Sequence, residues 1–481
     1  MLEELNHSGY IVIKRQVGKR KTINCRYEYE FKDGLLYIYA FEKVPEISGI
    51  REVLGTGFDR VNYLFVASTE ITDDWSDKYP KRIRIDYVVK NFENDAICNQ
   101  AVISFDELQY FCPSASVVQE DSTGNVTFLN ERKELKSFDI TVDSKPCHVC
   151  FRLRNEGNTG FAKSYMTAIT DIAISFPKTN DYEFLKKIYL VVDKVFAFIC
   201  NRCNTTCLSM IVNGKYKCID YSDGKNVKRM FPFSFEIFYF DYYREEPENN
   251  EVIKNTWWAS GFFSHIDALF DLVAKDLSGI EDENGRGTIS IDSIHPSLKR
   301  RRKIDLQLSL QIASAFEFYV RKYLPNMIEE KKYHKEVKQA LEQIYETSKG
   351  KKKKKLVKDL IDHVVIEPAL EDKIWKVYNG YGKWKPVKPC ISEVWFNENE
   401  IRKLGSEMNE WRNDLAHSKR KYKPSANTIR AVRLIEHLNY SIVLRKLGYS
   451  DEEIMDILSH VLIHEIFVDK YPDLNDLLSS K

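Results

Sequence analysis

Three polar residues in the C-terminal part of the chain, Arg412, Asn413 and His417, have the types and spacing that acid–base chemistry on a phosphate requires. Of the ten histidines, His417 is the one with an arginine five residues before it. On a helix, positions 413 and 417 lie one turn apart on one face. A histidine can accept or donate a proton near neutral pH, a guanidinium can hold two phosphate oxygens, and an amide can orient either group. The alternative is a helix end at which Arg412 and His417 only interact with the helix dipole.

Two basic clusters precede this motif. The first contains Arg300, Arg301 and Arg302, and the second contains Lys351, Lys352, Lys353, Lys354 and Lys355. We expect the second cluster in a loop before a helix that begins at residue 356. Each cluster could bind RNA, because every phosphate that a lysine or arginine neutralises releases counterions and raises affinity. The alternative is a solvated loop or helix start.

The charge is unevenly distributed along the chain. The 481 residues hold 72 Lys and Arg against 71 Asp and Glu, a net charge of +1. Residues 285–481 hold 37 basic and 28 acidic residues, a net charge of +9, whereas residues 1–284 hold 35 and 43, a net charge of −8. Such asymmetry predicts that a polyanion would bind the second half.

Cysteines provide a second kind of candidate site. Cys147 and Cys150, together with Cys200 and Cys203, supply enough thiols for a structural zinc ion. The alternative, which we prefer, is that these are free core thiols and that the chain binds no metal.

The first half of the chain has the patterns of β-strands. Residues 25–31 alternate apolar and charged side chains, and a turn at Asp33-Gly34 leads to a second alternating run at 36–40. Residues 181–198 instead have a helical period, and Asn213-Gly214 is expected to be the turn of a later hairpin, before an aromatic segment at 231–243. The spacing predicts an antiparallel sandwich or barrel rather than βαβ units. Further strands are expected at 61–66, 83–89, 126–129, 138–142, 149–153, 172–176, 208–212 and 216–219.

The second half has the period of helices. A stripe from Ile304 to Tyr323 ends before Pro325, and Ser450 with Glu453 forms a capping box at the start of a later helix. Turn-forming residues at 280–299 indicate a linker. We therefore divide the chain into a β-rich sensor or regulatory region (1–230), a connecting segment (231–284) and a helical domain (285–481). A bundle of about five helices is expected, and the candidate segments are the stripe at 304–323 and five further segments at 331–346, 356–364, 398–415, 426–447 and 451–462.

Composition limits the class of protein. The chain is 43% hydrophobic with 27 Tyr and 27 Phe, which excludes wholesale disorder. It has no apolar run long enough for a membrane helix and no secretion signal at its start, so we expect a cytoplasmic protein without membrane association.

The pattern from Arg412 to His417, within a helical domain of this size, resembles the R-N-x-x-x-H signature of the HEPN superfamily. A β-rich region followed by a helical domain that contains RNDLAH also resembles the ApeA-like HEPN proteins of bacterial anti-phage defence. The nucleotidyltransferase-linked HEPN toxins differ, because they place a tyrosine two residues after the histidine, where this chain has Lys419.

This resemblance implies an α+β multidomain fold, in which an antiparallel β-rich N-terminal region is followed by an all-α HEPN helical bundle. It implies a metal-independent endoribonuclease without a cofactor, with Arg412, Asn413 and His417 as catalytic residues and 2′,3′-cyclic phosphate ends as products. HEPN domains dimerise with their two motifs facing each other, so a homodimer with a composite site is expected. The implied substrate is RNA, with tRNA as a candidate, in abortive defence unleashed by a phage-derived trigger.

A non-catalytic protein is the alternative. Its helical domain would only dimerise or bind nucleic acid in a regulatory role, with a structural zinc site at the cysteines and RNDLAH as a packed helix end. Toxicity on overexpression that disappears in Arg412→Ala or His417→Ala favours the enzyme.

Overall fold

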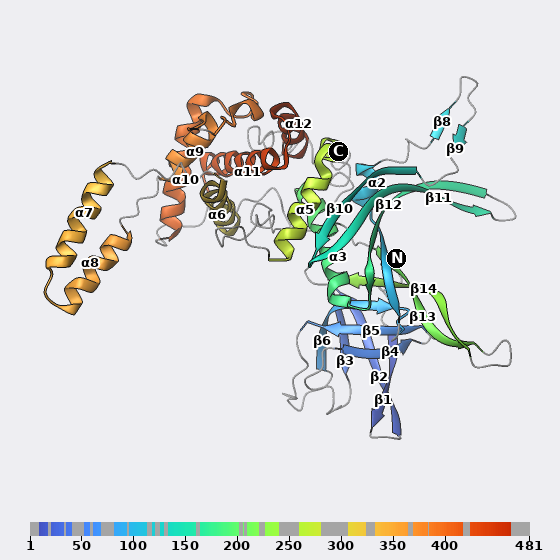
Figure 1. Cartoon of the computed structure of the whole chain (residues 1–481). Helices are drawn as coiled ribbons and strands as arrows, with labels where there is room; N and C mark the ends of the chain where they lie inside the picture. Colours follow the sequence, from blue (N-terminus) through green and yellow to red (C-terminus); the bar gives the residue numbers. More distant parts are fainter. Residues whose placement is uncertain are drawn as a thin grey trace. The chain divides into compact units, whose positions relative to one another are not determined.

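The chain folds as two compact units, Met1–Ile280 and Glu281–Lys481, which are described separately below. Figure 1 shows the computed structural model with its helices and strands. The residues that it describes are 9–17, 21–32, 35–40, 52–57, 61–68, 81–93, 96–112, 118–120, 126–128, 133–159, 164–201, 205, 209–220, 227–239, 259–279, 306–323, 332–363, 369–382, 384–416 and 424–462.

The first unit contains a twelve-stranded sheet in which all pairings between the described strands are antiparallel. One part of it closes on itself, because β6 pairs with β3 and also with β5, and so completes a ring in the order β6-β3-β2-β1-β4-β5 (Figure 1). This ring confirms the expected antiparallel architecture. Its strands are β1 (Gly9–Val17), β2 (Lys21–Lys32), β3 (Leu35–Ala40), β4 (Glu52–Gly57), β5 (Asn62–Ala67) and β6 (Lys81–Lys90).

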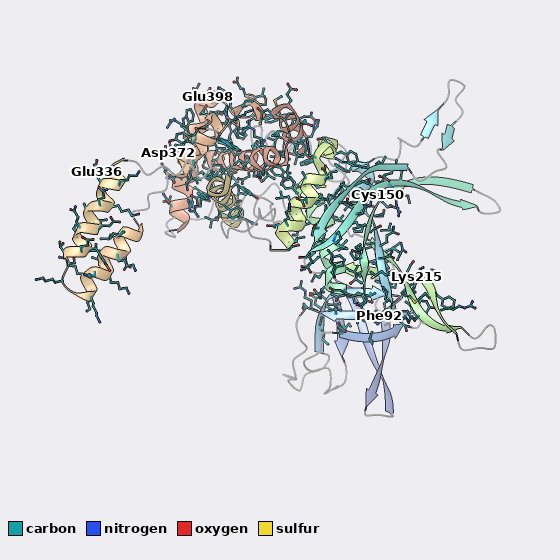
Figure 2. The ribbon with its side chains drawn as sticks, viewed as in Figure 1. Phe92, Cys150, Lys215, Glu336, Asp372 and Glu398 are labelled. Atoms are coloured by element: carbon teal, nitrogen blue, oxygen red, sulfur yellow. The ribbon has the colours of Figure 1, made fainter. Side chains whose placement is uncertain are left out.

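The other part of the sheet is open and continues from β6 in the order β14-β13-β7-β12-β11-β10. Figure 2 labels Cys150 on β11 and Lys215 on β13. Separately, β8 (Val118–Glu120) pairs with β9 (Val126–Phe128). The open strands are β7 (Ile97–Ser104), β10 (Lys133–Val142), β11 (Lys145–Thr159), β12 (Ser164–Thr179), β13 (Ser209–Asp220) and β14 (Val227–Tyr239).

Gly214 corrects one expectation about this sheet. Asn213 and Gly214 lie inside β13 and form no turn, since β13 pairs continuously with β14 across them. A Cβ at Gly214 would stand 2.4 Å from the carbonyl oxygen of Ile97 on β7. Glycine is therefore needed here for the close approach of two strands at a register shift, not for a hairpin.

Helices pack against one face of the open sheet through aromatic rings. Phe151 of β11 lies edge-on to Phe270 of α5 (Ile266–Leu277), and Phe176 of β12 lies edge-on to Phe184 of α3. As expected, α3 (Tyr182–Ile199) is a helix, and Asp181 caps it by accepting a hydrogen bond from the Phe184 backbone N–H. A short 3-10 helix, η3 (Ala259–His265), precedes α5. Burial of these rings supplies the core of the first unit.

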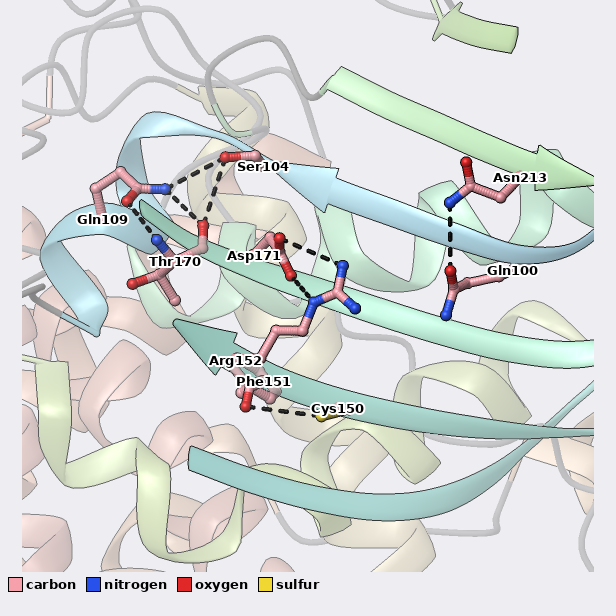
Figure 3. Close-up of polar contacts among 9 residues, drawn as sticks. All are labelled: Gln100, Ser104, Gln109, Cys150, Phe151, Arg152, Thr170, Asp171 and Asn213. Atoms are coloured by element: carbon pink, nitrogen blue, oxygen red, sulfur yellow. Dashed lines mark hydrogen bonds and ion pairs between the residues drawn. The ribbon is translucent and has the colours of Figure 1, made fainter. Parts of the chain in front are cut away.

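Polar side chains join neighbouring elements of the first unit, as Figure 3 shows. Gln109 of α2 (Asp106–Phe111) donates to the Thr170 carbonyl at 2.7 Å and accepts from the Thr170 N–H at 2.9 Å. Arg152 of β11 pairs with the fully buried Asp171, its register partner on β12. Both oxygens of Asp171 are engaged, one by Nε and the other by Nη2, the latter at 3.4 Å.

The second unit is helical, which confirms the predicted bundle. Its central helix is α11, which is buried continuously from residue 431 to residue 444 and packs against α6, α9, α10 and α12. The predicted capping box is present, since Ser450 accepts from the Glu453 backbone N–H and the Glu453 carboxylate accepts from the Ser450 N–H. The helices are α6 (Leu306–Tyr323), α7 (Lys332–Thr347), α8 (Lys351–His363), α9 (Leu370–Asn379), α10 (Glu398–Ala416), α11 (Ala426–Leu447) and α12 (Asp451–Val461), with a 3-10 turn η6 (Lys388–Cys390).

Two helical segments differ from the expectations. The helix α9 was not predicted, because it is short and is flanked by Pro368 and Gly380. The helix α8 begins at Lys351 rather than at residue 356, so Lys351–Lys355 are helical and not part of a loop. Lysine is a good helix former, and a run of like charges does not prevent a helix when the side chains point into water. Within the part of the chain that the structure describes, no helix is long and apolar enough to cross a membrane.

Candidate active site

The helix α10 carries Arg412 and Asn413 near its C-terminal end. A buried stripe of Ile401, Leu404, Met408 and Trp411 packs this helix against its neighbours. Close packing against α9 is allowed by Gly405, at which a Cβ would come within 3.2 Å of the Glu371 Cα. Since successive residues are turned by about 100° on a helix, Arg412 lies beside the buried stripe and its side chain is 37% exposed.

Arg412 is bound from inside the domain by Glu317 of α6. Its Nη2 atom lies 2.8 Å from Glu317 Oε2. The other carboxylate oxygen, Oε1, accepts a hydrogen bond at 2.9 Å from Lys373 Nζ of α9. One carboxylate therefore joins three helices, α6, α9 and α10.

Burial makes this arrangement electrostatically strong. Glu317 is 7% exposed and Lys373 is 1% exposed. A carboxylate taken out of water needs charged or hydrogen-bonding partners to offset its desolvation, and here it has two. The three side chains together carry one net positive charge. The Arg412 side chain is 37% exposed, so this group of charges is open to water on one side, where a phosphate could bind.

Of the predicted catalytic residues, Arg412 and Asn413 lie on the described part of α10. Asn413 is exposed, and Asp414 beside it is partly buried. His417 follows directly after the last described residue of this helix and lies outside the described residues, as does Lys419. The expected placement of Asn413 and His417 one turn apart therefore stays a prediction.

A second histidine, His437 of α11, is buried and has a different environment. Its Nδ1 atom donates to the Arg433 carbonyl oxygen at 2.8 Å, and its ring lies near those of Trp395 and Phe396. Burial lowers the pKa of His437 to about 4, so it is neutral at pH 7. Its role is to pack the core of the helical unit.

The basic clusters differ in what the structure describes. Arg300, Arg301 and Arg302 lie outside the described residues. Lys351, Lys352, Lys353 and Lys355 are exposed on the first turns of α8, whereas Lys354 is partly buried, with its ammonium 5.2 Å from the centre of the Tyr345 ring on α7. Figure 2 shows the side chains that project from α7 and α8, with Glu336 of α7 labelled.

The cysteine set does not form a common site where it is described. Cys147 is buried on one face of β11, but Cys150 lies three residues on and belongs to the opposite face. Burial raises the pKa of the Cys147 thiol to about 11, and that of Cys150 is also raised. Cys200 follows α3 and is buried, while Cys203 lies outside the described residues. Among the described residues, no three side chains of the kinds that bind metals are close enough to hold an ion.

Glu317 and Lys373 are site residues that sequence reasoning did not identify. The available signal was an acidic residue between the apolar residues Phe316 and Phe318, in a helix whose neighbouring positions are buried. A charge within an apolar stripe indicates a paired or functional group. Lys373 gave no such signal, because the helix that contains it was not predicted.

Comparison with known families adds one match. Residues 310–453 match the family model described as Apea-like HEPN. This range runs from within α6 to the start of α12, and so contains Arg412, Asn413 and His417, together with Glu317 and Lys373. It includes the lysines of α8 but not Arg300, Arg301 and Arg302. No curated protein and no solved structure matches the chain.

Proposed function

Because residues 310–453 of this chain form an Apea-like HEPN domain, a type of domain associated with RNA cleavage, we propose that the chain is a metal-independent endoribonuclease. The observation that supports this most directly is the position of Arg412. A buried carboxylate pairs with the Nη2 atom of its guanidinium, and the Arg412 side chain is 37% exposed.

The proposed reaction uses the nucleophile that RNA itself carries. The ribose 2′-OH attacks the adjacent phosphorus, the bond from phosphorus to the 5′-oxygen breaks, and the products are a 2′,3′-cyclic phosphate and a 5′-OH. One group must take the proton of the 2′-OH and another must give a proton to the leaving oxygen. His417 can do either near neutral pH, and Arg412 stabilises the negative charge that builds on the phosphate oxygens. Asn413 orients the imidazole or the phosphate.

A single histidine does not readily supply both the acid and the base in one turnover. We therefore place the reaction at a homodimer interface where two copies of the Arg412, Asn413 and His417 motif face one RNA strand. The histidine of one copy then serves as the base and that of the other as the acid.

RNA is the proposed substrate, with tRNA as the candidate class, and abortive anti-phage defence is the proposed role. An active ribonuclease has to be restrained in a healthy cell. The first unit, with a net charge of −8 over residues 1–284, is the proposed restraint and sensor of a phage-derived trigger. Its charge would repel RNA or bind the basic half of the chain.

The test is incubation of the purified full-length chain with total tRNA in EDTA, followed by mapping of the cleavage ends. Cleavage with 2′,3′-cyclic phosphate ends is expected, and it should disappear in His417→Ala while the dimer persists in gel filtration. Lys403→Ala is the matched control, because Lys403 is an exposed basic residue of the same helix that lies on the side opposite Arg412. Full activity in His417→Ala contradicts the proposal.

One observation favours a non-catalytic alternative. Arg412 is engaged in an ion pair with Glu317, as an arginine that only packs helices together would be. In that case the domain would dimerise or bind RNA without cleaving it. Binding of tRNA without cleavage would favour this alternative, whereas equal toxicity of wild type and Arg412→Ala on overexpression would favour neither.

A further inference from the structure

We propose that Glu317 is the positioning residue for Arg412, and that Lys373 holds Glu317 in place. This inference rests on the proposed ribonuclease function, since it says how the arginine of that site is kept ready for a phosphate. Neither residue belongs to the motif from Arg412 to His417.

Two consecutive contacts link the buried Lys373 to the partly exposed Arg412 through Glu317. Lys373 binds Oε1 of Glu317 at 2.9 Å, and Oε2 of Glu317 binds Nη2 of Arg412 at 2.8 Å. The three side chains come from three helices that pack against one another, α9, α6 and α10. The carboxylate is thereby fixed by two interactions that do not depend on a substrate.

Burial shows which of the three side chains are held in place by packing. Lys373 and Glu317 are almost wholly buried, so their side chains are confined by packing, whereas the Arg412 side chain is 37% exposed. A long arginine side chain at a surface otherwise samples many rotamers, and this freedom must be lost when it binds a phosphate in one geometry. Glu317 removes that freedom before the substrate arrives.

Donor count explains why the carboxylate does not block the guanidinium. Arginine has five N–H donors, and Glu317 engages the Nη2 atom with one oxygen because Lys373 takes the other. Among the described residues, Glu317 is the ion-pair partner of Arg412, and this pair needs one N–H donor, so by donor count others can bind phosphate oxygens. The pairing of one carboxylate with two cations also keeps one net positive charge at the site.

The test uses a variant pair that should preserve the fold. Glu317→Gln alone removes the carboxylate that the buried Lys373 binds, and this change could unfold the protein. Glu317→Gln combined with Lys373→Met removes both charges and keeps similar side-chain lengths. The matched control is Arg433→Met with Glu436→Gln, which removes a buried ion pair (2.7 Å) from α11 of the same unit without touching Arg412.

Two measurements are made on the full-length proteins. The first is steady-state cleavage of tRNA, resolved into kcat and KM. The second is the rate at which phenylglyoxal modifies Arg412, measured by mass spectrometry, with Arg402 of the same helix as the internal reference. This rate reports whether Arg412 is held, whether or not the chain cleaves RNA.

We expect the Glu317→Gln, Lys373→Met protein to melt and elute like the control pair. Its kcat should fall by about 10- to 100-fold, with a much smaller change in KM, because the geometry of the reacting complex is lost rather than substrate binding. Modification of Arg412 should accelerate several-fold while that of Arg402 stays constant. A folded variant with wild-type kcat, or with an unchanged modification rate, overturns the inference. Cleavage that persists in Arg412→Ala contradicts the proposed function instead, and the modification rate still decides whether Glu317 holds Arg412.

Discussion

Arg152 in the sheet unit and Arg412 in the helical unit each bind a buried carboxylate, but they do so in different ways. Arg152 uses Nε and Nη2 on the two oxygens of Asp171, and its side chain is 16% exposed. Arg412 uses Nη2 on one oxygen of Glu317, since Lys373 occupies the other, and its side chain is 37% exposed. The first pair sums to no net charge and the second group to one positive charge. Arg152 therefore joins two strands, whereas Arg412 still has donors for a ligand.

The largest effect is expected for Arg412→Ala. Loss of a group that stabilises developing charge typically costs about 10²- to 10³-fold in rate, so tRNA cleavage should fall by at least that much. The fold should persist, because Glu317 keeps Lys373 as a partner. The measurement is cleavage rate beside thermal melting, with Arg412→Lys as a control that keeps charge but loses the planar fork. A rate close to that of the wild type would show that the two arginines are equally structural.

Arg152→Ala should have the opposite profile. It leaves the fully buried Asp171 without its register partner, which typically destabilises a fold by about 3–5 kcal/mol. The measurement is hydrogen exchange of the β11 and β12 amides in the full-length chain, where protection should fall. The double change Arg152→Met with Asp171→Leu should recover most of the protection. Unaltered exchange in Arg152→Ala would mean that water or another group replaces the pair.

A smaller effect is expected on the pH dependence of the free energy of unfolding, which should differ between the two units. The pKa of His437 is about 4 in the folded chain and near 6.5 when unfolded, so the unfolded state binds more protons between these values. The stability that neutral His437 supports is complete above pH 6.5 and declines as pH falls toward 4. We expect the helical unit to lose about 2 kcal/mol between pH 7.5 and pH 5 through this residue alone.

The check is urea unfolding of wild type and His437→Gln at both pH values, where the variant should lose less stability on acidification. Equal pH dependence of wild type and His437→Gln would contradict the assignment.

The sheet unit contains a group whose effect on stability has the opposite pH dependence. Burial raises the pKa of Asp193, so its contribution to stability is complete at low pH and declines as pH rises through the folded pKa.

The smallest effect is expected for the lysines of α8. Lys352→Glu with Lys353→Glu should weaken tRNA binding and reduce the slope of log affinity against log salt by about 0.7–0.9 for each phosphate that is no longer neutralised. Lys215→Glu with Lys217→Glu on β13 is the matched control in the acidic half, and both lysines are exposed. The binding is measured at several salt concentrations with an uncleaved RNA or with His417→Ala. Identical slopes in both variants would remove α8 from the RNA surface.

Local patterns predicted the helical unit well where a helix is long and capped. The bounds of α11 agree with the expected 426–447, and the capping box at Ser450 is present. Periodicity and capping act over a few residues, so they are visible in the sequence. The same reasoning missed α9, whose ten residues fit less than three turns, and it placed Lys351–Lys355 in a loop.

The antiparallel strands of the sheet were predicted, but one of the turns that were expected to connect them was wrong. Alternation identified the strands, and the pairing of β2 with β3 across residues 33 and 34 confirms the first hairpin. Asn213-Gly214 has the composition of a turn, yet it lies in mid-strand because a distant segment, Ile97, lies too close for a side chain. Contacts between segments that are far apart in the sequence decide such cases.

By itself, the sequence determined the antiparallel and helical halves, their opposite charges and the motif from Arg412 to His417, because each depends on residue types at short spacing. Only the tertiary structure showed that Glu317 pairs with Arg412 and that Lys373 pairs with Glu317. Glu317 and Lys373 are separated from Arg412 by 95 and 39 positions, and no local pattern links them. Packing of α6, α9 and α10 brings the three charges together, and burial makes their pairing obligatory, since a carboxylate out of water must be bound.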